Sequence, residues 1–207
     1  MSPRATAIVL AACAIPAALA GHPGAVVYST DFESGSPSGV WSVDQVAQTG
    51  PLSRFLGRFG STSLTMSVAL QANAVHELAF DLYTIDSWDG SDSPWGPDWF
   101  GVKVDGAEIF KETFSNFGGP QTYEGSPVAS GAFGFEHWND SVWRLSLLFT
   151  PNSNNATITF FAQGLEPMHN ESWGLDNVVV RELPTIPAPG GAALLLGSAA
   201  AALRRRR

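Results

Sequence analysis

The stretch Leu64-Thr65-Met66-Ser67-Val68-Ala69-Leu70 carries an apolar side chain at every second position. Because successive side chains of a β-strand point to opposite faces, this alternation predicts a strand with one face in a core. The same period occurs at 78–83, 143–149 and 157–160, whereas residues 21–185 contain no sustained helical period. Many such strands, separated by turns rich in Gly, Pro and Asn, predict an all-β antiparallel sandwich.

One hairpin of this sandwich can be placed in register. The dipeptide Asp105-Gly106, between two short apolar runs, is typical of a two-residue type I′ turn. Such a loop fixes the register on either side, and here opposite charges and apolar side chains would face each other across the hairpin. The expected pairs are Lys103 with Glu108, and Val102 with Ile109.

The composition indicates one globular domain with a strongly acidic body. The chain has 207 residues, 44% of them hydrophobic and 14% charged, which excludes a disordered acidic tail, a collagen-like repeat and a coiled coil. Five of the eleven cations lie at Arg4 and 204–207, while all nineteen acids lie between Asp31 and Glu182. The body therefore has six cations, nineteen acids and a net charge of −13. Because such a body is repelled by phosphate backbones, we expect no nucleic-acid partner.

The N-terminal segment has the features of an export signal. A basic residue precedes an apolar run that ends in Ala18-Leu19-Ala20, a small-x-small cleavage pattern. This pattern predicts a signal peptide over residues 1–20. One alternative is a buried N-terminal helix, which Pro16 would break. The other is lipidation of Cys13, because Leu10-Ala11-Ala12-Cys13 resembles a bacterial lipobox. Cys13 is the only cysteine, so the chain left after cleavage would contain no disulfide.

The C-terminal segment 184–207 has three parts. Proline-rich residues 184–191 precede an apolar run over 192–203, and four arginines follow. This order resembles the PEP-CTERM sorting signal of exported bacterial proteins, in a variant with Pro-Ala-Pro-Gly where the family has Pro-Glu-Pro. The resemblance implies a short hydrophobic helix and recognition by an exosortase-type membrane protease. The alternative is a C-terminal anchor that is never cut. The motif residues are Pro187, Ala188, Pro189, Gly190, Arg204, Arg205, Arg206 and Arg207.

Both ends of the body resemble a known class of sandwich. The body opens with Tyr28-Ser29-Thr30-Asp31-Phe32-Glu33 and closes with Trp173-Gly174-Leu175-Asp176-Asn177-Val178. These stretches are similar to the first and last strands of jelly-roll carbohydrate-binding and lectin-like modules. The resemblance implies a jelly-roll domain over residues 21–183, whose two terminal strands lie side by side.

The last strand carries one candidate calcium site. Asp176 shares the strand parity of Val178 and Val180, so we expect its side chain to point toward the face that these residues bury. A buried carboxylate needs a charge partner or hydrogen bonds, and Asp31 and Glu33 would add oxygens from the adjacent first strand. In the modules that the chain resembles, this corner often holds a structural calcium, which takes about six to eight oxygen ligands. The alternative is that Asp176 caps a turn.

The segment 86–99 carries a second candidate site, because it alternates acids with tryptophans and contains no cation. Like charges crowded in one loop repel each other, and a bound calcium would relieve the repulsion. Tryptophan beside carboxylate also suits a sugar, which stacks on the ring and donates hydroxyl protons to the acid. A third interpretation is a solvated loop whose tryptophans pack back onto the sandwich. The candidates are Asp86, Asp89, Asp92 and Asp98 for calcium, and Trp88, Trp95 and Trp99 for a glycan.

Motifs of common enzymes are absent from the sequence. It has no closely spaced Glu-x-Asp motif of sandwich-fold glucanases, no metal-binding histidine spacing, no Gly-x-Ser-x-Gly elbow and no phosphate loop. We therefore expect an exported, non-enzymatic protein of the cell envelope or extracellular matrix, which binds polysaccharide and contains structural calcium. It would meet the membrane only through its C-terminal segment. The alternatives are an adhesive matrix protein that binds other proteins, and a secreted glycan hydrolase.

Overall fold

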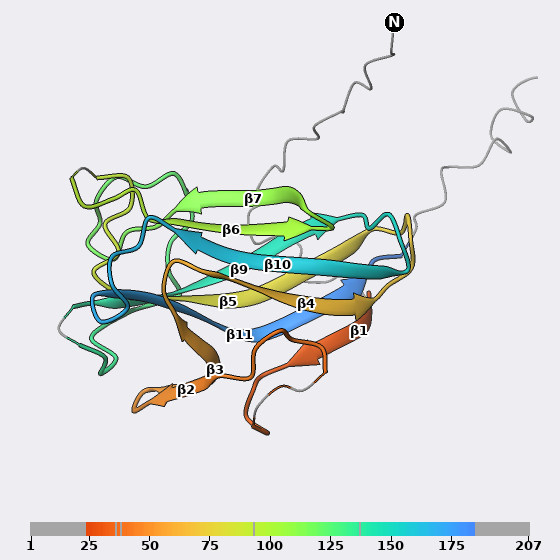
Figure 1. The fold of residues 1–207 in the computed structure, drawn as a ribbon, viewed down its shortest axis with the longest axis horizontal. Helices are drawn as coiled ribbons and strands as arrows, with labels where there is room; N and C mark the ends of the chain where they lie inside the picture. The colour runs from red at the N-terminus through yellow and green to blue at the C-terminus, as the bar shows by residue number, and fades with distance from the viewer. Residues whose placement is uncertain (1–23, 36, 38, 93, 137, 185–207) are drawn as a thin grey trace, which may run out of the picture.

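The structure is a computed structural model that describes residues 24–184, apart from 36, 38, 93 and 137. Eleven strands form two antiparallel sheets packed as a β-sandwich, as the alternation predicted (Figure 1). No helix long and apolar enough to cross a membrane occurs in the described part of the chain. The predicted signal peptide with Cys13, the C-terminal hydrophobic helix and the motif residues at 187–190 and 204–207 lie outside the described residues.

The larger sheet has the strand order β2-β3-β11-β5-β9-β8, and β1 also pairs with β11. The smaller sheet has the order β4-β10-β6-β7. The strands of the larger sheet are β1 (Ala25–Thr30), β2 (Val46–Thr49), β3 (Leu52–Phe59), β5 (His76–Asp86), β8 (Ala129–Gly131), β9 (Asp140–Phe149) and β11 (Glu171–Glu182). Those of the smaller sheet are β4 (Ser63–Ala69), β6 (Trp99–Val104), β7 (Ala107–Thr113) and β10 (Asn155–Gln163).

The main core lies between the two sheets and is built from the inward side chains that the alternation predicted. Aromatic contacts join the sheets: Phe100 of β6 lies edge to face against Trp173 of β11, with 5.4 Å between the ring centroids. Such a pair adds about 0.5–1.5 kcal/mol beyond its buried area. The predicted inward residues that are buried are Leu64, Met66, Val68, Leu70, Leu78, Phe80, Leu82, Trp143, Leu145, Leu147, Phe149, Ile158 and Phe160.

The hairpin of β6 and β7 forms the predicted turn but departs from the predicted register. In the dipeptide Asp105-Gly106 both φ angles are positive, 50° and 82°, as a type I′ turn requires. After the two residue pairs next to the turn, the register between the strands shifts, because β7 contains one extra residue. The prediction for Val102 was therefore wrong by one residue. The observed pairs are Lys103 with Glu108, as predicted, and Val102 with Phe110 in place of Ile109.

Strand β11 changes partners along its length. Residues 173–175 pair with β3, and residues from Val178 onward pair with β1, so the first and last strands lie side by side as expected. Between these parts the register shifts, and Asn177 has a φ of 51°. This bulge breaks the parity on which the prediction for Asp176 relied. Val178 packs into the main core, whereas Asp176 accepts a hydrogen bond from Tyr83, which belongs to a separate cluster.

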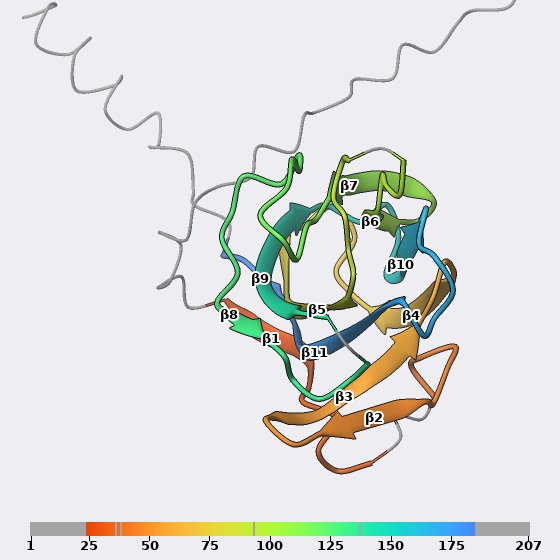
Figure 2. The ribbon, with the colours of Figure 1, turned by 90° about the vertical axis from the view of Figure 1, so that its left-hand side faces the viewer.

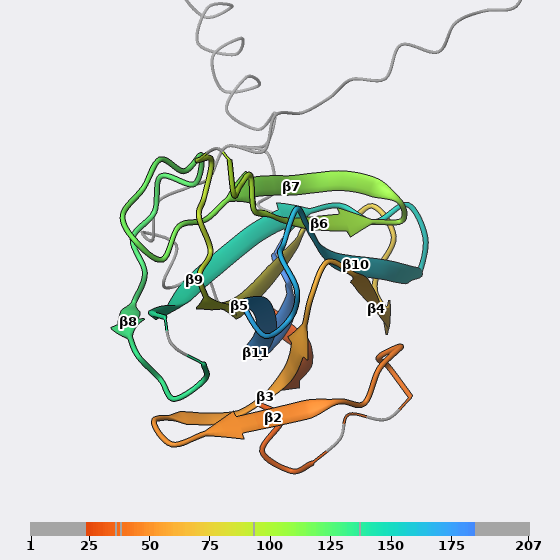
Figure 3. The same cartoon turned by 60° about the vertical axis from the view of Figure 1, so that its left-hand side comes forward.

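Four connections gather at one end of the sandwich, which we call the loop end (Figure 2). They are the β5–β6 connection (87–98), the β7–β8 connection (114–128), the β8–β9 connection (132–139) and the β10–β11 connection (164–170). Figure 3 shows the same connections from an oblique direction. The loop end therefore brings together segments that are far apart in the sequence.

Candidate metal centre

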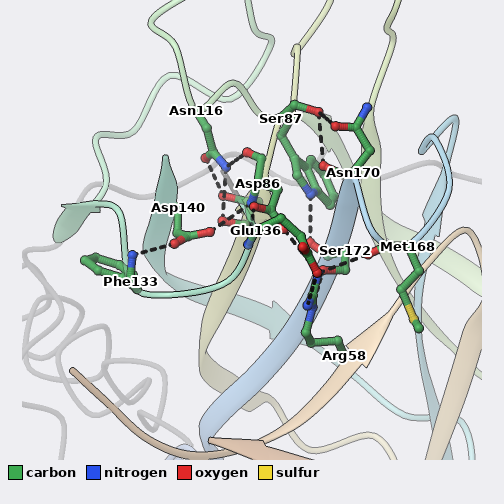
Figure 4. Close-up of polar contacts among 12 residues, drawn as sticks. Arg58, Asp86, Ser87, Asn116, Phe133, Glu136, Asp140, Met168, Asn170 and Ser172 are labelled. Carbon is green, nitrogen blue, oxygen red and sulfur yellow. Dashed lines mark hydrogen bonds and ion pairs between the residues drawn. The ribbon is translucent and has the colours of Figure 1, made fainter. Parts of the chain in front are cut away.

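A network of buried polar groups lies beneath the loop end and is centred on Asp86, the last residue of β5 (Figure 4). Its carboxylate accepts a hydrogen bond from the amide of Glu136 and forms an ion pair with Arg58, each at 3.1 Å. Its own amide donates to Asp140 at 2.9 Å, and its carbonyl accepts from Asn116 at 2.7 Å. Burial raises the pKa of Asp86 above its ordinary range. Because both carboxylate oxygens already have partners, this acid does not need a metal.

Three other acids converge at the loop end. Asp89 lies in the β5–β6 connection, Asp98 directly precedes β6, and Glu171 is the first residue of β11. One carboxylate oxygen from each lies within 4.8 Å of the other two, and among the described residues no other group of acids, His or Cys converges so closely. The sequence predicted Asp89 and Asp98 as candidates, but it gave no reason to choose Glu171. We call these three residues the acidic triad.

Local backbone contacts bring the two loop acids of the triad together. The amide of Asp89 donates to the carboxylate of Asp98, and the amide of Asp98 donates to the carbonyl of Gly90 at 2.8 Å. Gly90 has a φ of 72°, a conformation that residues with a Cβ rarely adopt. A Cβ at this position would also lie 2.3 Å from the carbonyl oxygen of Pro120. Glycine therefore allows the β5–β6 connection to close tightly enough to place both acids side by side.

The acidic triad has an unbalanced charge. The side chains of Asp98 and Glu171 are wholly buried, and Asp89 is partly buried. Burial, reinforced by neighbouring carboxylates including Glu166, raises the pKa of Asp98 to about 7 and that of Glu171 to about 8. The same two causes raise the pKa of Asp89. Within the described residues, no Lys or Arg lies within 4.0 Å of these acids. The triad could therefore hold a metal ion.

The other predicted residues of this segment lie elsewhere. Asp92 is exposed and lies outside the triad. Trp88 is wholly buried, and its indole N–H donates to a backbone carbonyl at 2.8 Å, so its ring has no exposed face for a sugar. Trp99 is half-buried, and the ammonium of Lys111 lies over its ring, 4.8 Å from the centroid. Trp95 is 63% exposed. Of the three tryptophans, Trp95 presents the most open ring.

The predicted calcium corner does not assemble as a cluster of acids. Asp31 and Glu33 are exposed, and Asp176 is buried. Within the described chain, these three do not come within 4.8 Å of one another as a group. The hydroxyls of Ser53 and Tyr83 donate to Asp176 at 3.0 and 2.9 Å, although burial still raises its pKa. The sequence predicted that this carboxylate needs either a charge partner or hydrogen bonds, and the structure provides hydrogen bonds.

Two exposed aromatic residues at the loop end were missed by the sequence analysis. Phe117 and Trp138 pack edge to face, with 5.8 Å between their ring centroids, and are 47% and 49% exposed. The residues on either side of Phe117 line a hollow of about 310 Å³, with Trp143 also in its wall. Phe117 and Trp138 lie in different connections, 21 residues apart in the sequence, so no local sequence pattern predicts that they pack together.

No family model and no curated protein matches this chain. Among solved structures, it is similar to dimeric latent PorU from Porphyromonas gingivalis, with 16% identity and a TM-score of 0.42 over 66% of this chain and 13% of that one. It is also similar to the N-terminal CBM22 tandem domain of Paenibacillus barcinonensis Xyn10C, with 13% identity and a TM-score of 0.43 over 84% and 50%. The chain thus spans half or less of both proteins.

A third similar structure is CBM35 from Cellvibrio japonicus Abf62, with 7% identity and a TM-score of 0.34 over 78% of this chain and 88% of that one. All three TM-scores lie below 0.5. The β-sandwich assignment therefore stands on the strands and core of this chain rather than on these likenesses.

Proposed function

We propose that this protein is exported and non-enzymatic, and that its β-sandwich binds extracellular polysaccharide at the loop end, with calcium as a structural ion. The observation that carries the proposal is the pair Phe117 and Trp138, whose rings pack against each other while about half of each side chain stays exposed. An exposed ring offers a flat apolar surface on which the C–H face of a sugar can stack. Trp95 adds a third open ring at the same end.

The hollow beside Phe117 supports a sugar ligand more than a protein ligand. Its wall is formed mainly by small polar residues and glycines, including Ser126, Ser130 and Gly118. Serine hydroxyls and backbone groups can exchange hydrogen bonds with sugar hydroxyls, while the neighbouring aromatic ring contacts the C–H face. An adhesive surface for another protein would need a larger apolar core than one aromatic pair provides. A polysaccharide is therefore the favoured ligand.

The burial of the acidic triad supports a non-enzymatic role. A glycoside hydrolase needs two carboxyl groups that flank the bond to be cleaved. Asp98 and Glu171 lie close together and have raised pKa values, but neither has exposed surface. A glycosidic bond cannot reach carboxyls enclosed in this way. We therefore assign the triad a structural role rather than a catalytic one.

The test of glycan binding uses the full chain and a panel of soluble and insoluble polysaccharides. The double variant Phe117→Ala, Trp138→Ala is expected to bind at least about tenfold more weakly, which corresponds to a loss of about 1.4 kcal/mol. Val75→Ala is the control, because Val75 is an exposed apolar residue that precedes β5 at the opposite end of that strand. Equal binding by wild type and the double variant would contradict the proposal.

Three further measurements separate the alternatives. Reducing-sugar release above background would indicate the hydrolase. Binding to matrix protein, with no binding to any polysaccharide, would indicate the adhesive role. For export, the intact mass of secreted material should correspond to a chain that begins near residue 21 and lacks the terminal arginines. A mature chain that begins at a lipidated Cys13 would contradict the predicted cleavage.

A further inference from the structure

The structure assigns a divalent-cation site, with Ca²⁺ as the preferred ion, to the acidic triad of Asp89, Asp98 and Glu171. The inference deepens the calcium part of the proposed function, on which it rests, and is independent of the glycan part. One carboxylate oxygen from each residue lies within 4.8 Å of the other two. This arrangement allows one ion to contact all three side chains.

Two oxygens of the triad lack the partners that buried oxygens need. Oδ1 of Asp98 and Oε1 of Glu171 are buried and accept no hydrogen bond from the described residues, and both side chains are wholly buried. Buried polar atoms in folded proteins nearly always have a partner, and an exception calls for an explanation such as an ion. A cation between the carboxylates would supply a partner to both oxygens at once.

The surrounding residues do not supply the missing positive charge. Glu166 adds a further acid beside the triad, where its charge raises the pKa values of all three members. The amide of Glu166 donates to the other oxygen of Glu171, at 2.6 Å. Two basic residues at this end are engaged elsewhere, because Arg58 pairs with Asp86 and Lys111 lies over a tryptophan ring. An ion pair within the described residues therefore cannot explain the cluster.

The donor set selects the kind of ion. All three side chains offer oxygen, and no His or Cys in the described part of the chain joins the group, whereas zinc and copper favour nitrogen and sulfur ligands. Magnesium demands nearly octahedral geometry and keeps several of its waters, while calcium accepts irregular sets of carboxylates. Three acids contributed by one connection and a strand end form such an irregular set. Calcium is therefore preferred over magnesium.

An ion at this position would join the two sheets. Asp89 follows β5 and Glu171 begins β11, which are neighbours in the larger sheet. Asp98 directly precedes β6 of the smaller sheet. A calcium ion held by all three would therefore clamp the sandwich at the loop end, beside the connections that carry the exposed aromatic residues.

The test measures calcium binding by the full chain without any glycan. Protein stripped with EDTA is titrated with CaCl₂ by calorimetry, and is melted in 5 mM Ca²⁺ and in 5 mM Mg²⁺ at constant ionic strength. We expect one site with a Kd of roughly 10⁻⁴–10⁻³ M, as in extracellular modules. Calcium should then raise Tm by roughly 2–8 °C, and magnesium should do so much less.

Variants locate the site. Glu171→Gln and Asp98→Asn should each abolish the calorimetric signal and the calcium-dependent rise in Tm. Asp31→Asn from the predicted corner and Asp92→Asn from the same connection should keep both. Circular dichroism in EDTA checks that the variants fold, and the partly exposed Asp89→Asn gives the same test if a buried variant does not fold. The assignment is overturned if calcium and magnesium raise Tm equally, or if Asp31→Asn loses calcium binding while Glu171→Gln keeps it. Neither outcome depends on the glycan experiment.

Discussion

The variant Asp98→Asn should stabilise the metal-free protein at pH 8, although substitution of a wholly buried residue usually destabilises. Burial raises the pKa of Asp98 to about 7, and the nearby charge of Asp89 contributes in the same direction. Above that pH the folded protein encloses a carboxylate that has no cation partner among the described residues. Asparagine keeps the shape of the side chain and removes the charge. It can also donate a hydrogen bond where the carboxylate could only accept one.

The size of the expected stabilisation follows from the raised pKa of Asp98. A carboxyl group whose pKa rises from its ordinary value of 3.8 to about 7 is disfavoured as an anion in the folded state by about 4 kcal/mol. If relaxation of the loop end recovers half of this penalty, the variant gains about 2 kcal/mol at pH 8. For a domain of this size the gain corresponds to a rise in Tm of roughly 4–8 °C.

The sign of the pH dependence is fixed by proton binding. Between the ordinary pKa and the raised one, the folded protein holds more protons at Asp98 than the unfolded chain does. The free energy of unfolding of the wild type therefore falls as pH rises through this window. Its contribution is fully present below pH 3.8 and is lost as the pH passes about 7. The advantage of Asp98→Asn should therefore be small at pH 4 and largest at pH 8.

Urea unfolding in EDTA at pH 4, 6 and 8 measures this difference directly. The control is Asp92→Asn, which removes an exposed acid of the same connection and should change the free energy of unfolding by no more than about 0.5 kcal/mol. A loss of more than about 1 kcal/mol in Asp98→Asn at pH 8 would refute the reasoning. It would mean that the folded state stabilises this carboxylate as an anion.

Two further substitutions test the structure around the site. Arg58→Met should lower the free energy of unfolding, measured in urea, by about 3–5 kcal/mol, because it leaves the buried Asp86 without its cation. Adding Asp86→Asn should recover part of this loss. If the effects of the two substitutions simply add, the ion pair is contradicted. Gly164→Ala should weaken calcium binding in calorimetry, because its φ is 92° and a Cβ would lie 2.0 Å from the carbonyl oxygen of Pro97. Gly118→Ala, with a positive φ but open space, is its control and should keep calcium affinity.

The fold could be predicted because its strands alternate cleanly. Apolar residues such as Leu78, Phe80 and Leu82 recur at period two, and the structure buries all three. The prediction failed where a single extra residue interrupts the period. The bulge at Asn177 moved Asp176 away from the face of the following valines. Such a bulge depends on pairing with neighbouring strands, so the alternation of one strand cannot reveal it.

The candidate site could be predicted only in part. The repulsion among closely spaced acids indicated Asp89 and Asp98 as ligands. It could not distinguish them from Asp86, which forms an ion pair with Arg58 in the structure. Glu171 lies 73 residues beyond Asp98 in the sequence, and it reaches the triad because β11 pairs with β5, whose end leads into the connection that carries Asp89 and Asp98. That proximity is a property of the sheet. No local pattern around Glu171 distinguishes it from a surface acid.

The acidic triad and the aromatic pair are separate features that are linked through the β7–β8 connection. Asp89 forms a β-bridge with Ser115, and the hydroxyl of Ser115 accepts hydrogen bonds from the amides of Phe117 and Gly119 at 3.2 and 3.1 Å. Two of the three acids have no exposed surface, so an ion held there would not need to touch a bound sugar. Its effect on glycan affinity would come from the order it imposes on the β7–β8 connection. Since a ligand gains affinity when its binding loop is already ordered, calcium and polysaccharide should strengthen each other's binding without direct contact.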